Sequence, residues 1–127
     1  MGKIKTMCLA AVLGSASQAS AGMSADLAET FAGCVGRFSA ELEHAWLMNE
    51  PTADDLQGRR LTFISLLEAS MPKGNARDIL SVRIESKLAH ASLLTAATFE
   101  RNSELSHAAK VSAAAYLSAC EMLILDG

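Results

Sequence analysis

The sequence has few aromatic, β-branched and proline residues. Aromatic side chains make up 5% of the 127 residues, and the two prolines, Pro51 and Pro72, lie between segments with regular apolar spacing. β-Strands are usually rich in β-branched and aromatic residues, so their scarcity argues against a sheet. Alanine, the strongest helix former, is abundant. The composition therefore predicts an all-α protein.

Clusters of basic residues are also missing. Lys and Arg are scattered along the chain, and 14 acidic residues outnumber 11 basic ones, which gives a net charge of −3. Proteins that bind nucleic acid use clustered Lys and Arg to displace counterions. Helices that bind anionic membrane surfaces likewise carry a basic face. Neither kind of partner is expected.

Motifs that carry catalysis or hold a cofactor are missing as well. The sequence contains no CxxCH haem-attachment motif, no HExxH zinc motif and no glycine-rich phosphate loop. No nucleophile motif surrounds any of its serines, and its three histidines fall on helix faces that are predicted to be exposed. We therefore expect a non-enzymatic protein without a cofactor.

The N-terminus has the three parts of a secretory signal peptide. Two lysines precede an apolar run over residues 7–14, and Ala19-Ser20-Ala21 supplies the small residues that signal peptidase requires. A membrane-spanning helix needs about 20 apolar residues, more than this run provides. We predict a signal peptide over residues 1–21, cleavage after Ala21, and a periplasmic or secreted protein with no stable membrane anchor.

The mature chain, residues 22–127, is long enough for a single domain. Cleavage removes two basic residues and no acidic ones, so the net charge becomes about −5. Apolar residues at three- and four-residue spacing predict four helices. Their expected ranges are 24–49, 53–70, 76–101 and 104–125, with Thr52, Asn75 and Ser103 among the N-caps. The short connections favour a small up-and-down helical bundle.

In the third predicted helix, two neighbouring apolar rows indicate a wide buried face. The first row contains Leu80, Ile84, Leu88 and Ala91, and the second contains Ile79, Val82, Ala89 and Leu93. On the opposite side, Arg83, Lys87 and His90 are expected to form a solvated basic stripe.

Two cysteines, Cys34 and Cys120, remain after cleavage, and both lie on the apolar stripe of their helix. The first and last helices of such a bundle are antiparallel neighbours, and the two cysteines lie within about two turns of the same height. An exported protein most simply pairs them. The bond would close a loop of about 86 residues and stabilise the fold by about 4–5 kcal/mol. The alternative is two buried thiols; no CxxC spacing favours a redox pair.

Two Glu-x-x-His pairs offer the sharpest chemical alternative. Glu41 with His44, and Glu104 with His107, each place a carboxylate and an imidazole on one helix face, as di-metal carboxylate bundles do. At about 100° per residue, however, both pairs point mostly to solvent. His44 and Met48, four residues apart, form a two-ligand candidate for copper. These residues are weak candidates, and no metal is assigned.

Trp46, Leu47 and Met48 lie at the edge of the first helix's apolar stripe. They are expected to form a small exposed apolar patch that could bind a partner. Alternatively, Trp46 covers the open end of the core. The leading prediction is an exported accessory protein that binds another periplasmic protein, in an oligomeric state that the sequence does not define. The alternative is a metal- or small-ligand-binding bundle that uses His44, Met48 or the Glu-x-x-His pairs.

Overall fold

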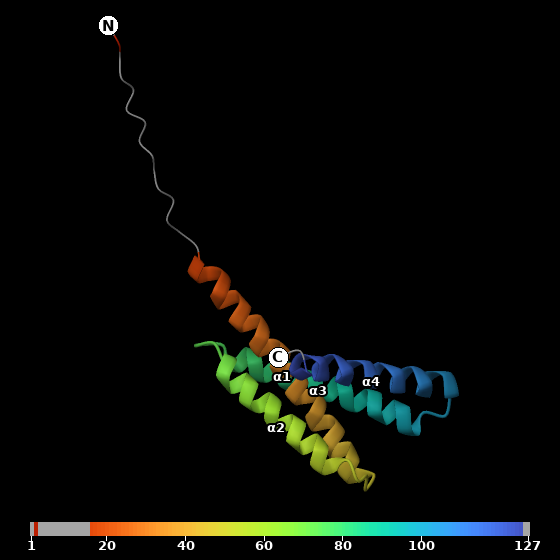
Figure 1. Cartoon of the computed structure of the whole chain (residues 1–127). Coiled ribbons are helices and arrows are strands. Elements are labelled where there is room, and N and C mark those ends of the chain that lie inside the picture. The colour runs from red at the N-terminus through yellow and green to blue at the C-terminus, as the bar shows by residue number, and fades with distance from the viewer. Residues whose placement is uncertain (1, 3–15, 126–127) are drawn as a thin grey trace.

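The computed structural model describes Gly2 and residues 16–125, apart from the side chains of residues 16–21 and 24. Within this range it contains four helices and no strand (Figure 1). The helices are α1 (Ala16–Leu47), α2 (Ala53–Ser70), α3 (Ala76–Phe99) and α4 (Ser103–Leu125). The predicted all-α fold with four packed helices is confirmed.

The last three helices begin and end within two residues of the predicted ranges. Thr52 and Asn75 occupy the N-cap positions of α2 and α3, as predicted. Thr52 and Asn75 make no side-chain cap hydrogen bond. At the start of α4, Asn102 Oδ1 accepts hydrogen bonds from the backbone N–H groups of Glu104 and Leu105, at 3.0 and 3.2 Å. The capping residue therefore lies one position before the predicted one.

α1 begins at Ala16, and its first turns extend beyond the other helices (Figure 1). Residues 1 and 3–15 of the predicted signal peptide lie outside the described residues. Met23 is exposed, and the buried core of α1 begins at Ala28. Cleavage after Ala21 would therefore shorten α1 and retain every residue of the core that the structure describes.

α1 is the central helix of the bundle and packs against α2, α3 and, over a short region, α4. Its buried residues cover a wide face of the helix: Ala28, Ala32, Cys34, Val35, Phe38, Ser39, Ala40, Leu42 and Ala45. A wide buried face lets one helix pack against several neighbours at once. Against α2, the ring of Phe38 stacks on that of Phe63, with centroids 5.5 Å apart.

A glycine contact sets the distance between α1 and α3, which run in the same direction. A Cβ atom added to Gly36 would overlap the carbonyl oxygen of Arg83 and lie 2.9 Å from the backbone nitrogen of Lys87. Backbone atoms cannot move aside without shifting the whole helix, so only glycine permits this approach. In a square four-helix bundle α1 and α3 would face each other across the diagonal; here they are in direct contact.

This contact turns α3 away from the orientation that the sequence predicted. Leu80, Ile84 and Leu88 are 52%, 48% and 63% exposed, whereas His90 is fully buried. The first apolar row is thus largely uncovered, and the placement of His90 on a solvated stripe was wrong. The reason is that Gly36 of α1 lies against the α3 backbone at Arg83 and Lys87, which brings His90, about two turns farther along α3, into the interface.

α4 packs along α3 and reaches α1 near its own C-terminal end. Ala113 is buried with Leu94 of α3 and Ala40 of α1, while much of the opposite side of α4 is exposed. Among the described helices, α4 alone is long and apolar enough to cross a membrane by length and composition, and 17% of its apolar window is buried. In the bundle it is therefore a largely exposed apolar helix.

Candidate functional site

Three open hollows follow one another along the side of α3 that faces away from α4. The first, between the end of α2 and the start of α3, has a volume of about 320 Å³. The central hollow, of about 470 Å³, lies over α1 and shares Leu80 and Arg83 with the first. The third, of about 600 Å³, runs from Leu88 to Glu100. We call this surface, which extends from Ala76 to Glu100 over about 36 Å, the α3 track.

The central hollow has apolar walls from two helices. Leu42 and Trp46, the chain's single tryptophan, come from α1, and Leu80 and Ile84 come from α3. Gln57 of α2 also lines it, and the buried Oε1 atom of Gln57 has no hydrogen-bond partner among the described residues. The hollow thus offers apolar surface for a ligand and one buried acceptor without a donor.

Three basic side chains surround the same hollow, Arg60 from α2 and Arg83 and Lys87 from α3. Lys87 Nζ lies 2.5 Å from Oε1 of Glu43, the carboxylate that lines the hollow. Arg60 Nε donates to Ser39 Oγ at 2.8 Å. Arg83 makes no ion pair with any described residue. The hollow therefore carries three positive charges against one negative on an otherwise acidic chain.

About two turns beyond Arg83 along α3, His90 belongs to a buried polar chain. Its Nε2 lies 2.8 Å from Glu41 Oε1, and its Nδ1 lies 3.3 Å from a terminal nitrogen of Arg37. Arginine can only donate, so Nδ1 must accept and Nε2 must carry the proton that is donated to Glu41. A neutral His90 satisfies both neighbours. Both ring nitrogens of His90 therefore have a hydrogen-bond partner within the fold.

Arg37 extends this chain to α4. Its guanidinium carbon lies 3.7 Å from the centre of the Tyr116 ring, within the range of a cation–π contact. Burial lowers the pKa of Arg37 below its usual value, and the electrostatic interaction with Tyr116 opposes this effect. Together the two contacts join α1, α3 and α4, which indicates a structural role for a network that the sequence analysis missed. Its closest sequence signal is Gly36, which allows α3 to lie close to α1.

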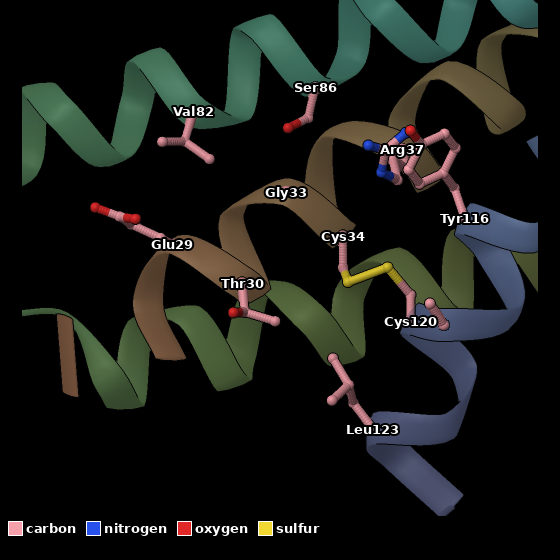
Figure 2. A pocket seen from close by; sticks show the side chains of 11 residues that line it. Glu29, Thr30, Gly33, Cys34, Arg37, Val82, Ser86, Tyr116, Cys120 and Leu123 are labelled. Atoms are coloured by element: carbon pink, nitrogen blue, oxygen red, sulfur yellow. A yellow bond between two sulfur atoms is a disulfide. The ribbon is translucent and has the colours of Figure 1, made fainter. Parts of the chain in front are cut away.

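A second cleft, of about 510 Å³, surrounds the disulfide between α1 and α4 (Figure 2). The bond joins Cys34 to Cys120, the pair that the sequence analysis selects, with their Cα atoms 5.7 Å apart. Thiol–disulfide exchange requires a thiolate to reach one of the sulfur atoms. Both cysteines are buried, so this arrangement favours a structural bond over a reactive one.

The predicted partner patch lies at the C-terminal end of α1. Trp46, Leu47 and Met48 are all exposed there. Trp46 lines the central hollow, whereas Leu47 and Met48 line none of the three hollows of the α3 track. The structure thus links one of the three residues to a larger surface on α3 that the sequence analysis did not identify.

The predicted metal ligands are not brought together. Glu41 is bonded to His90, and His44 Nε2 lies 3.2 Å from Thr98 Oγ1. The remaining candidates, Met48, Glu104 and His107, are exposed. In the part of the chain that the structure describes, no group of three or more His, Cys, Asp and Glu side chains is arranged to hold a metal ion.

No protein-family model, curated protein or solved structure matches this chain.

Proposed function

We propose that this chain is an exported, non-enzymatic interaction protein that docks another protein along the α3 track. The observation that carries the proposal is an exposed apolar row on α3, formed by Leu80, Ile84, Leu88 and Phe99. Single exposed apolar residues are common, but a contiguous apolar surface with polar neighbours is typical of an interaction site. Trp46 beside the row belongs to a residue type that is enriched where binding energy is concentrated.

Export is supported by two features besides the N-terminal pattern. The proposed cleavage after Ala21 retains all the buried residues that the structure describes, the first of which is Ala28. A bond between Cys34 and Cys120 suits an oxidising compartment, where disulfides persist. The proposed location is therefore the periplasm or the exterior of the cell.

Mass spectrometry of the protein from a periplasmic extract, prepared without reductant, tests the export. We expect a chain that begins at Gly22 and lacks the two hydrogens of free Cys34 and Cys120. A full-length chain that stays in the cytoplasmic fraction would contradict the proposal.

Site-specific photocrosslinking in the protein's own host tests the docking surface. A photoreactive amino acid replaces Leu88 in the α3 track, and Val111, which is exposed on α4 outside the track, serves as the matched control position. We expect a light-dependent adduct with another polypeptide at Leu88 and little or none at Val111. Adducts of equal yield at both positions, or none at Leu88, would count against docking at this surface.

A further inference from the structure

We infer that the segment that docks on the α3 track is an acidic amphipathic helix of the partner, selected by Arg60, Arg83 and Lys87. This inference rests on the proposed docking function and adds the chemistry of the partner. It draws on two independent features of the track, its length and the distribution of its charges.

The length of the track suits an extended segment. The three hollows follow one another over about 36 Å, the length of a helix of about 24 residues. A helix that lies in such a groove presents apolar anchors at three- and four-residue spacing. Leu80, Ile84 and Leu88, which follow one another at four-residue spacing on α3, provide a matching series of apolar contacts.

The charges of the central hollow favour a negative segment over a positive one. In the central hollow, Lys87 is already paired with Glu43, so Arg60 and Arg83 remain for the partner. A guanidinium group binds a carboxylate through two parallel hydrogen bonds. A lysine of the partner cannot accept these bonds. A basic helix would be repelled, so the sign of the charge discriminates between partners.

The ends of the track refine this prediction. Glu68 lines the first hollow and Glu100 lines the third, whereas the basic excess lies in the central hollow. The partner's carboxylates are therefore expected near the middle of its helix, with uncharged polar residues toward both ends.

Peptide titration tests the inference on protein produced from the full chain and purified without reductant. The probe is a synthetic peptide of about 21 residues, three heptads with leucine at a and d. Glutamate fills the polar positions of the middle heptad, and glutamine fills the others. The matched peptide carries lysine in place of glutamate. Binding is measured by the anisotropy of a label on the peptide and by the fluorescence of Trp46, the chain's only tryptophan.

The variant R83Q/K87Q removes two of the three positive charges and leaves Glu43 unpaired, so the central hollow becomes neutral. Its matched control, R101Q/K110Q, removes the same two charge types from exposed positions outside the track. We expect the acidic peptide to bind at least about tenfold more weakly to R83Q/K87Q, and within about twofold of the unaltered protein to the control. Circular dichroism of each variant verifies that it is folded.

Three outcomes would overturn the inference: equal affinity for both peptides, an unchanged affinity of R83Q/K87Q, or binding to phosphatidylglycerol vesicles with no binding of the acidic peptide. The photocrosslink at Leu88 separates this failure from failure of the proposed function. If the crosslink forms but the acidic peptide does not bind, the track docks a partner of different chemistry. If the crosslink is also absent, the docking function itself is wrong.

Discussion

The two sides of α3 contrast in polarity and in burial. The side that faces α1 holds a polar network around His90, yet it is sealed by the contact at Gly36. The opposite side carries Leu80, Ile84 and Leu88, yet it is open. The contrast teaches that the apolar character of a helix face does not alone decide which face is buried. The distance to which a neighbouring helix can approach decides it as well.

The largest effect on this arrangement is expected from loss of the disulfide, which holds α4 beside α1 and α3. In C34S/C120S, the loop of 86 residues is no longer closed in the unfolded chain. We expect the free energy of unfolding to fall by about 4 kcal/mol, measured by chemical denaturation under non-reducing conditions. A loss below about 1 kcal/mol would mean that α4 is held by its packing alone.

The next largest effect is expected from an added methyl group at Gly36. In G36A the new Cβ would overlap the backbone of α3 at Arg83, which cannot move aside independently. We expect a loss of about 3 kcal/mol, because overpacking against backbone forces the two helices apart.

Gly58 provides the control for this substitution. It lies in α2, where an added Cβ would meet no atom within 4 Å. G58A should therefore stabilise the protein by about 0.5–1 kcal/mol through its helix propensity. If both variants gave the same change, the α1–α3 contact would not be as close as we describe.

The positions of the helices could be predicted from the sequence because they depend on local signals. Pro51 and Pro72 interrupt the apolar periodicity, and both lie in the short connections between helices. The cysteine pair could be selected from the compartment and from the heights of Cys34 and Cys120 along their helices. Neither prediction depends on knowing which helices pack against each other.

The orientation of α3 could not be predicted, because it depends on a neighbour that is remote in sequence. Gly36 allows the close approach, but a glycine in α1 does not reveal which helix will use it. The same uncertainty placed His90 on the exposed side. It also concealed the α3 track, in which Trp46, Arg60 and Arg83 come from three different helices.

A smaller effect is expected from His90. H90A leaves a cavity and removes the hydrogen-bond partner of Glu41 and of Arg37. Since Glu41 retains some contact with solvent, we expect a loss of about 2 kcal/mol in thermal or chemical unfolding. S92A, at an exposed position of α3, should change stability by less than about 0.5 kcal/mol. Equal effects of H90A and S92A would show that the polar network contributes little.

The smallest effect on stability is expected from polar substitutions on the open side of α3. Comparing stability with peptide binding in such variants tests most directly the central claim, that this side of α3 is a docking surface. The double variant I84Q/L88Q alters the exposed row, and L94Q makes the same kind of change on the buried side of the same helix. The free energy of unfolding of each is compared with that of the unaltered protein, together with binding of the acidic peptide. We predict that I84Q/L88Q unfolds within about 0.5 kcal/mol of the unaltered protein but loses peptide binding, whereas L94Q loses about 3 kcal/mol. If I84Q/L88Q lost as much stability as L94Q, the apolar row would be core, and the docking surface that we assign to α3 would not exist.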